Sequence, residues 1–484
     1  MQAKKLIKAS AVMSALLVAI GFGSAQGCGG SDDSSFPSGG ADGGPGSGGD
    51  SGQGFVTPAG DGGGDHCVSG LCTQAVDCTG KPSDTTISGV VTDPAGKNPL
   101  YNVLVYIPND PAKVPTYTDG PSCDLCGSAI PGGIASSAVT GIDGSFTLSK
   151  VPVGANIPVI VQVGKWRRTY TFANTVACQA NAAPSNDVFR LPKNQGEGHI
   201  PKMAITTGGA DTMECMFRRM GLDDAEFLAG TGRVGLYGGK GSGGSATTKY
   251  DGTHGGTNFP DSRAFWNDPA QVNAQDIIIY SCEGSANDGD KTANGIPNTI
   301  DFLNHGGKMF ASHWHRGFFS KEPTLATIGT WSDETDPDDP STGNVVTTFP
   351  KGLALSQWLV KVGASTTPGS LQIKAPRENV YSIVKPGTEW VYIDNGGADP
   401  KNHVPEFTTV DTPVGAADDK LCGKAAFSDL HVSSGGSGDA NNGKAWPGEC
   451  ATGDLTAQEK ALEFLFFDLS ACVQNDSVAP PPPR

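Results

Sequence analysis

The sequence predicts a multidomain protein in which an N-terminal β-sandwich precedes a C-terminal α/β domain built on a doubly wound, mostly parallel sheet. Two patterns carry this prediction. Between residues 85 and 195, short alternating apolar segments are separated by turn sequences, which is typical of a sandwich. From residue 199 to 474, apolar strands alternate with helical segments, which is typical of a parallel sheet covered by helices. A length of 484 residues accommodates both domains.

The composition excludes one class of partner and indicates unstructured stretches. Lys and Arg number 34 against 50 Asp and Glu, a formal net charge of −16. Because a duplex-binding protein needs a basic face to displace counterions, we expect no nucleic-acid partner. Gly and Pro make up about a fifth of the chain, so we expect globular parts joined to flexible segments.

Residues 1–27 have the organisation of a signal peptide. A positively charged start precedes an apolar run over 11–22 that is too short to cross a bilayer. Small residues then lead to Cys28, and this junction resembles a bacterial lipobox, whose Cys becomes the first mature residue and carries the lipid. The resemblance implies a lipid-anchored protein of the cell envelope, and Gly29 in place of Asp implies the outer membrane, surface-exposed or periplasmic. Ordinary secretion with a coincidental Cys is the alternative.

Three further segments read as linkers or tails. After Cys28, residues 28–65 are rich in Gly, Ser and Asp and predict a disordered tether, because such a segment buries too little apolar surface to offset its ordering entropy. Residues 66–84 form a short Cys-rich segment. Residues 475–484 end in a proline run and are predicted to be disordered.

The cysteines predict disulfides. The chain has 12 Cys, and setting Cys28 aside leaves eleven, so an oxidising compartment should pair ten and leave one free. We expect Cys282 to be the free one, because it closes a buried apolar strand. Cys123 and Cys126 form a C-x-x-C in a Gly/Pro/Ser loop. This loop lacks the strand and helix of a redox motif and the second C-x-x-C of a zinc site.

The sandwich elements follow one another at short intervals. We expect strands at 85–91, 100–107 and 157–163, and a hairpin over 140–148 with Asp143-Gly144 at its turn.

The order of short motifs in this region resembles the carboxypeptidase regulatory-like (transthyretin-like, prealbumin-like) β-sandwich over about 85–172. The matching pieces are Ser88-Gly89-Val90-Val91, Asn102-Val103-Leu104-Val105, Asp143-Gly144-Ser145-Phe146 and Val151-Pro152-Val153-Gly154, with an insertion over 109–137. Domains of this family are usually non-catalytic and share a fold with carbohydrate-binding modules, so the resemblance implies a binding or spacer role.

A basic and aromatic run, Lys165-Trp166-Arg167-Arg168, stands out in this acidic chain. One interpretation is a patch for an anionic glycan with Trp166 as its platform. The other is an edge strand whose charges discourage pairing and whose Trp is packed inside.

In the second domain, the apolar pattern places strands and helices in alternation. We expect strands at 201–207, 233–237, 276–281, 308–313 and 424–431. We expect helices from Asp211, with an Asp211-x-x-Glu214 capping box, at 298–304, at 353–362, and from Thr456 to about Cys472, with a Thr456-x-x-Glu459 box.

Polar and reactive residues gather at the ends of these strands, which is where open parallel sheets hold their ligands. Thr206 and Thr207 end the first strand ahead of a helix N-terminus, a possible anion cradle. The other strand ends carry Cys282 and Glu283, His313, Trp314 and His315, and Asp429 and His431.

The pattern Asp276-Ile277-Ile278-Ile279, then Gly306-Gly307-Lys308 through His313, then Gly423 through His431, resembles the class I glutamine amidotransferase-like fold and its ThuA-like branch. The resemblance covers about 200–474 and implies a flavodoxin/amidotransferase-like sheet. Glutaminases place a Cys nucleophile where this chain has His313, so ammonia transfer is not expected. The ThuA-like branch has His at that place and is linked to sugar metabolism.

One hypothesis for this edge is a metal site. His313 and His315 share a face if the chain is extended there, and with His431 and Asp429 they offer ligands that suit Zn²⁺. A water on such a metal would attack the substrate.

Two other hypotheses remain open. Cys282 is a nucleophile with His431 as its base, oriented by Asp429 or Glu283. Alternatively, the strand ends bind a ligand without catalysis or merely cap the sheet.

Together these observations predict an envelope lipoprotein that binds carbohydrate or serves as an adhesion or scaffold protein. Trp166 and Trp314 are its candidate aromatic contacts. The alternative is a metal- or Cys-dependent hydrolase acting on a sugar or amide at the carboxyl edge of the second domain.

Overall fold

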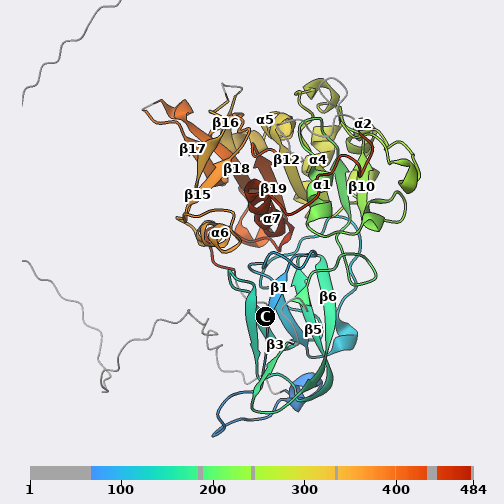
Figure 1. Ribbon diagram of the computed structural model, residues 1–484, viewed down its shortest axis with the longest axis vertical. Coiled ribbons are helices and arrows are strands. Elements are labelled where there is room, and N and C mark those ends of the chain that lie inside the picture. Colours follow the sequence, from blue (N-terminus) through green and yellow to red (C-terminus); the bar gives the residue numbers. More distant parts are fainter. Residues whose placement is uncertain are drawn as a thin grey trace, which may run out of the picture. The chain divides into compact units, whose positions relative to one another are not determined.

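The computed structural model describes residues 67–183, 189–240, 246–332, 336–397, 399–432 and 444–480 (Figure 1). The predicted signal peptide, Cys28 and the tether lie outside the described residues. In the part of the chain that is described, no helix is long and apolar enough to cross a membrane.

Two four-stranded sheets make up the N-terminal region. Their strands are β1 (Thr86–Thr92), β2 (Leu104–Pro108), β3 (Ile134–Val139), β4 (Ser145–Ser149), β5 (Gly154–Val163), β6 (Trp166–Thr175), β7 (Ala180–Ala182) and β8 (Phe189–Arg190). One sheet has the order β4-β1-β7 with β8 also on β1, and the other has the order β3-β2-β5-β6. Alternating residues such as Val105, Leu148 and Val159 are fully buried between them.

The segment expected to be a hairpin around Gly144 connects the two sheets instead. Its two strands, β3 and β4, pair with β2 and β1 respectively, so they never pair with each other as a hairpin would. Gly144 does supply the positive φ, at 71°, and a Cβ there would lie 2.4 Å from the carbonyl oxygen of Val91. The turn chemistry was therefore predicted correctly, but the pairing is decided by packing between the sheets.

The C-terminal region is built on one nine-stranded sheet. Its strands are β9 (Met203–Thr206), β10 (Val234–Tyr237), β11 (Ile277–Tyr280), β12 (Lys308–Ser312), β14 (Ser341–Val345), β15 (Ser370–Ile373), β17 (Thr388–Asp394), β18 (His403–Thr412) and β19 (Gly423–Ser428), in the order β10-β9-β11-β12-β19-β18-β17-β14-β15. β13 (Gly329–Trp331) and β16 (Val380–Ile383) form a separate two-stranded sheet.

The prediction of a mostly parallel sheet is correct for only half of this large sheet. The pairings from β10 to β19 are parallel, whereas those from β19 to β15 are antiparallel. For β17–β18 and β18–β19 the reason lies in the short connections, such as the one from Asp394 to His403. A parallel neighbour needs a crossover of a dozen or more residues, and such connections permit only antiparallel pairing.

Helices cover both faces of the parallel half. The helices of the C-terminal region are α1 (Met213–Arg219), α2 (Ser262–Trp266), α3 (Pro269–Val272), α4 (Gly295–Asn304), α5 (Gly317–Ser320), α6 (Pro350–Lys361) and α7 (Ala457–Ser470), and of these α6 packs against β14 in the antiparallel half. On β19, Ala426 packs in the core that contains α7, whereas Ala425 and Phe427 pack in the core that contains Phe302 of α4. Because both faces are covered, every residue of β19 is buried, including Lys424 and Ser428.

The two expected capping boxes have different outcomes. The box at Thr456 and Glu459 is present at the start of α7. The box at Asp211 is absent, because α1 begins at Met213 after Thr212 and the Asp211 carboxylate bonds to other parts of the chain.

The N-terminal sheets and the large sheet share one continuous hydrophobic core. Trp166 is buried and packs edge-on against Phe466 and Phe467 of α7, with ring centroids 6.5 and 5.8 Å apart. This contact corrects the interpretation of Trp166 as an exposed glycan platform. The neighbouring charges are also engaged, since Lys165 pairs with Asp276 at 2.5 Å.

Five disulfides join the described cysteines, which indicates an exported protein. They are Cys67–Cys72, Cys78–Cys178, Cys123–Cys422, Cys126–Cys472 and Cys215–Cys450. Cys282 is the free cysteine among the described residues, as predicted. The C-x-x-C therefore ties the N-terminal insertion to two points of the C-terminal region.

The ordered chain continues beyond residue 474, where the sequence suggested a disordered tail. Asp476 is buried and receives Lys351 at 3.0 Å and Lys424 at 2.8 Å. The same two lysines reach Asp468 at 2.8 and 3.4 Å. We call Lys351, Lys424, Asp468 and Asp476 the ionic cluster. Its charges hold residues 475–480 against the sheet.

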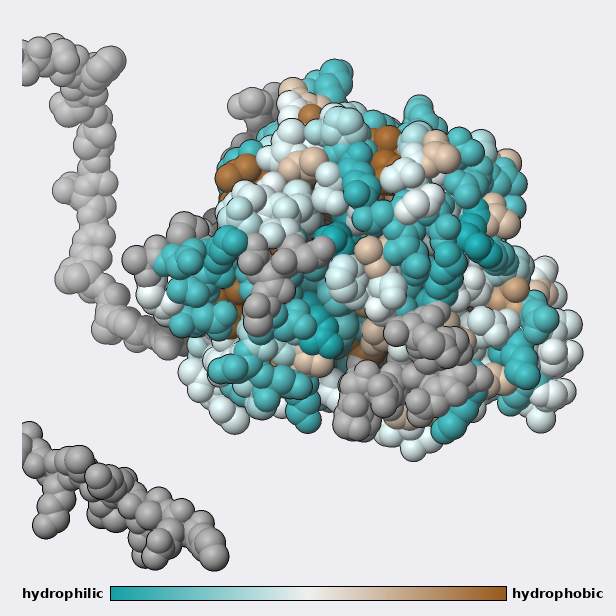
Figure 2. Space-filling view, turned by 90° about the horizontal axis from the view of Figure 1, so that it is seen from above, coloured by the Kyte–Doolittle hydropathy of each residue, from teal (hydrophilic) through white to brown (hydrophobic). Residues whose placement is uncertain are grey.

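Hydrophilic and intermediate residues dominate the face shown in Figure 2, with only small hydrophobic spots between them. This agrees with the few large apolar side chains that are exposed in the described chain, among them Leu353, Val384 and Val478.

Candidate functional site

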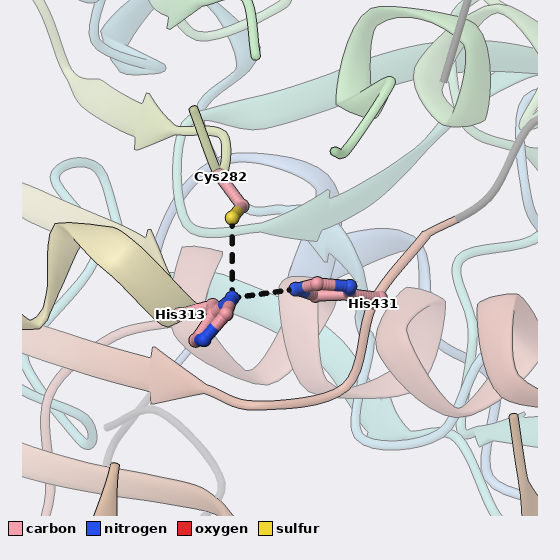
Figure 3. Close-up of side chains that lie close together, drawn as sticks. All are labelled: Cys282, His313 and His431. Carbon is pink, nitrogen blue, oxygen red and sulfur yellow. Dashed lines mark hydrogen bonds between the residues drawn. The ribbon is translucent and has the colours of Figure 1, made fainter. Parts of the chain in front are cut away.

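Three neighbouring parallel strands each deliver one reactive side chain to the same edge of the sheet (Figure 3). Cys282 follows β11, His313 follows β12, and His431 follows β19. β12 pairs with both β11 and β19, all in parallel, so the carboxyl ends of the strands meet. This is the edge at which α/β sheets hold ligands.

The three side chains converge on one atom. Nδ1 of His313 lies 3.3 Å from Sγ of Cys282 and 3.0 Å from Nε2 of His431. All three potential ligand atoms lie within 4.8 Å of one another. We call these residues the Cys–His cluster. Cys282 is fully buried, while His313 and His431 retain exposed fractions of 5% and 8%.

His313 occupies an unusual backbone conformation. β12 ends at Ser312 in extended geometry, and His313 then turns with φ at 39°, in the left-handed region that favours glycine. A non-glycine residue held there costs on the order of 1–3 kcal/mol. The rest of the fold holds His313 in this conformation despite the cost, and the turn directs the imidazole toward Cys282.

Burial keeps the Cys–His cluster uncharged. It is the main cause that lowers the pKa of both His313 and His431 below the ordinary imidazole value. It also raises the pKa of the Cys282 thiol, and the nearby Asp211 carboxylate adds to that shift. At neutral pH the two imidazoles are therefore neutral, which is the form that binds metals.

Nδ1 of His313 cannot form good hydrogen bonds with both of its neighbours in the Cys–His cluster. Nδ1 of a neutral imidazole either donates one hydrogen or accepts through one lone pair. In His313 this single atom faces both a thiol and a second imidazole. A shared metal ion would instead use one lone pair from each of the three atoms.

The predicted third histidine points elsewhere. After His313 the chain enters a short 3-10 helix (His313–Arg316), so residues two apart no longer share a face. His315 is fully buried among aromatic rings, with centroids 5.4 Å from Tyr280, 5.8 Å from Phe318 and 6.0 Å from Trp266. The expectation that His315 joins His313 at one metal is wrong for this reason.

Asp429 does not orient His431. β19 ends at Ser428, so Asp429 and His431 lie beyond the sheet and not on an extended strand. The Asp429 carboxylate accepts the backbone N–H of Asn379 at 3.0 Å, and no hydrogen bond to His431 occurs among the described residues. Burial raises the pKa of Asp429 and that of the neighbouring Glu406.

The residues predicted to bind ligand at the other strand ends either bond to other parts of the chain or have no hydrogen-bond partner in the described structure. Glu283 is buried and pairs with Lys291, 3.3 Å away. The Thr207 hydroxyl donates to the carbonyl of Thr247 at 2.5 Å, and the Thr206 hydroxyl is buried without a partner in the described structure. No anion cradle is formed by these side chains.

Trp314 is the predicted aromatic contact that does lie at the site. Its ring is half-buried, with its centroid 4.6 Å from that of His313, and the Arg316 guanidinium lies 5.0 Å from it. One partly open aromatic ring therefore borders the Cys–His cluster.

Sequence reasoning missed the role of Asp211. It assigned this residue to a helix cap, whereas its carboxylate contacts all three connections that carry the Cys–His cluster. An acidic residue in the connection that follows a parallel strand is a signal for such a role, but the helix pattern offered a simpler explanation.

No family model matches the chain, and no curated protein matches it. Among solved structures, the chain is similar to a ThuA-like protein from Bacteroides uniformis ATCC 8492, at 12% identity over 55% of this chain and 90% of that chain, with a TM-score of 0.28. It is also similar to a type II cohesin–X-dockerin complex from Acetivibrio cellulolyticus, at 17% identity over 31% and 88%, with a TM-score of 0.16.

A further similar structure is the dioxygenase domain of a dioxygenase carbohydrate-binding protein fusion from Streptomyces sp. SirexAA-E, at 22% identity over 35% and 86%, with a TM-score of 0.11. With every TM-score below 0.5, the function has to be argued from the site itself.

Proposed function

We propose that the protein is an exported lipoprotein, anchored at Cys28, whose C-terminal region is a zinc-dependent hydrolase centred on Cys282, His313 and His431. The observation that carries the proposal is the convergence of Sγ, Nδ1 and Nε2 within 4.8 Å at the carboxyl edge of the parallel strands. Three protein ligands with one position left for substrate are the arrangement of catalytic zinc sites.

The donor set fits the ion. Zinc binds thiolate sulfur at about 2.3 Å and imidazole nitrogen at about 2.0–2.1 Å, so tetrahedral ligands lie roughly 3.3–3.6 Å apart. The distances of 3.3 and 3.0 Å in the Cys–His cluster need to expand by only a few tenths of an ångström. A bound cation also favours the thiolate form of Cys282, which burial alone opposes.

Each residue then has a definite part. His313 and His431 offer neutral nitrogens, and Cys282 offers sulfur. Trp314 provides the partly open ring beside them, a surface on which an apolar face of a sugar substrate can rest. Bound zinc would supply Lewis acidity toward a carbonyl or glycosidic substrate.

A second candidate rests on a different contact. Sγ of Cys282 also accepts the N–H of Gly284 at 3.4 Å, so the thiol has both a base, His313, and a backbone donor within reach. These are the contacts of a cysteine nucleophile, with His313 and not His431 as its base. The raised pKa of the thiol disfavours this candidate relative to the zinc site.

A carbohydrate-binding or scaffold role without catalysis retains only part of its support. Trp166 lies in the core, which leaves Trp314 as the remaining predicted aromatic contact. We therefore place sugar recognition, if sugar is the substrate, at the Cys–His cluster and not on the N-terminal sheets.

The test is the metal content of the tag-free, full-length protein by mass spectrometry. We expect about one zinc per chain in the natural protein and at least a tenfold lower content in His313→Ala and in His431→Ala. His305→Ala is the matched control, because the side chain of His305 is 67% exposed and His305 precedes the amino end of β12, whereas His313 follows its carboxyl end.

Equal zinc content in the natural protein and in both cluster variants would contradict the zinc site. Absence of metal from the natural protein after equilibration with zinc would contradict it as well. Circular dichroism of each variant checks that the fold is retained.

A further inference from the structure

We infer that Asp211 is the positioning residue of the Cys–His cluster: one carboxylate holds the three connections that carry its ligands. The inference rests on the proposed function and deepens it, because it names the residue that sets the affinity of that site for its metal.

The contacts of Asp211 are distributed over all three connections. Oδ1 accepts the backbone N–H of Val432, next to His431, at 2.7 Å. Oδ2 accepts the backbone N–H of Cys282 itself at 3.4 Å. Oδ2 also accepts the hydroxyl of Ser312, the residue before His313. Each bond therefore ends on a cluster residue or on its immediate neighbour.

The arrangement makes Asp211 and the three connections depend on one another. Asp211 is fully buried, and no ion pair to it occurs among the described residues. A buried carboxylate without a cation is costly unless several donors satisfy it. The donors come from the ends of three different strands, so the carboxylate is satisfied only when these ends converge.

Neighbouring backbone contacts show that the β9–α1 connection acts as a strap across the site. The N–H of Ala210 donates to the carbonyl of Cys282 at 3.0 Å, and that of Thr212 donates to Val432 at 3.4 Å. Gly208 permits this approach, because a Cβ there would lie 2.0 Å from the carbonyl oxygen of Cys282. Asp211 is the side chain of this strap that reaches all three ligand-bearing connections.

Asp211→Asn is the variant that tests the role of this carboxylate most directly. It preserves volume, but the amide nitrogen cannot accept a hydrogen bond, so at least one connection loses its partner. Residues that orient metal ligands through hydrogen bonds typically change metal affinity by about 10–100-fold. We expect zinc affinity, measured by competition with a chelator on the full chain, to fall by this factor.

Glu226→Gln is the matched control. Glu226 is also a buried carboxylate with three donors, from Gln195 N, Gln195 Nε2 and Arg233 N, at 2.8, 3.0 and 3.2 Å. We expect this variant to lose stability without losing zinc affinity. Cobalt substitution adds a spectroscopic signature, since the thiolate-to-cobalt absorption should shift in Asp211→Asn and stay unchanged in Glu226→Gln.

A metal-free arm separates the inference from the proposed function. Without metal, the Cys282 thiol should react with a thiol reagent at least several-fold faster in Asp211→Asn than in the natural protein or in Glu226→Gln. If the natural protein binds no zinc, the proposed function fails, and this arm still tests Asp211. Equal labelling rates, or equal losses of zinc affinity in both variants, would overturn the positioning role.

Discussion

The ionic cluster beneath the sheet and the Cys–His cluster at its carboxyl edge are both almost completely buried, yet only the first balances its own charges. Lys351 and Lys424 meet Asp468 and Asp476 at 2.8 to 3.4 Å, and Lys424 also reaches Asp411 at 3.6 Å, so each cation has carboxylate partners. The Cys–His cluster gathers three uncharged donors with no opposite charge among them. A buried group that is already satisfied serves the fold, whereas one that is not satisfied points to a ligand.

The electrostatic shifts in the two clusters reflect the same difference. Burial alone would raise the pKa of Asp476, but Lys424 and Lys351 together lower it. Burial would lower the pKa of Lys424, and its three aspartates raise it well above the ordinary value. In the Cys–His cluster burial outweighs the opposing effect of the Asp211 carboxylate on His431, so the pKa values of His313 and His431 both lie below the ordinary imidazole value.

The largest expected effect comes from breaking the balanced cluster. Asp476→Asn removes one of the two carboxylates that contact both buried lysines, which leaves Asp468 as the one shared by the two, so the free energy of unfolding should fall by about 3–5 kcal/mol. Urea denaturation at pH 7 measures this change, and zinc content should not change. Asp419→Asn is the control, because the exposed pair of Asp419 with Lys420 should contribute less than about 1 kcal/mol. A loss in Asp476→Asn no larger than in this control would show that the charges do not hold the tail.

A smaller effect concerns the pH dependence of stability, which should have opposite signs for a buried carboxylate without a cation and for one paired with cations. Burial raises the pKa of Glu449 from 4.5 to about 7, so the folded state favours its protonated form. Its stabilising contribution is therefore complete below pH 4.5 and is lost as pH rises toward 7, by at most about 3 kcal/mol. Asp476, with its lowered pKa, has the opposite sign, because its contribution is lost as pH falls below 3.8.

Unfolding experiments on Glu449→Gln and the natural protein across pH 4.5–7 test this sign. The variant should lack the decline that Glu449 contributes, and the difference between the two proteins should grow toward pH 7. Parallel curves would mean that Glu449 ionises normally in the folded protein.

The smallest expected effect concerns the histidine outside the cluster. His315→Phe replaces a neutral ring among Tyr280, Phe318 and Trp266 with an apolar ring of similar volume. Stability should change by less than about 1.5 kcal/mol, and zinc content should equal that of the natural protein. Loss of zinc in this variant, with the fold intact by circular dichroism, would return His315 to the metal site and contradict the assignment of ligands.

The parts of the site that depend on strand order were predictable from the sequence. Cys282, His313 and His431 each come shortly after a largely apolar strand, and the rule that parallel strands bring their carboxyl ends together brings the three residues together. The positions of His315 and Asp211 depend instead on one backbone turn at His313 and on hydrogen bonds between connections far apart in sequence. No local pattern encodes those features.

The fold shows the same division. The apolar parallel strands and the capping box at Thr456 were recognisable, because their patterns are continuous or strictly spaced. The antiparallel strands between residues 341 and 412 were not, since strands such as Ser341–Val345 and His403–Thr412 mix polar with apolar residues and contain no continuous apolar run. Disulfide pairing was not predictable either, because Cys123 and Cys422 are 299 residues apart and only the folded chain brings them together.

The two disulfides from the N-terminal insertion also determine how the protein withstands proteases. Cys123–Cys422 and Cys126–Cys472 span sequence separations of 299 and 346 residues and overlap over most of the C-terminal region. A protease that cuts one peptide bond between residues 126 and 422 leaves both fragments covalently joined. Their separation then requires, besides the cut, reduction of both bridges and of any other disulfide that spans the cut, such as Cys215–Cys450, which suits a protein that works outside the reducing interior of the cell.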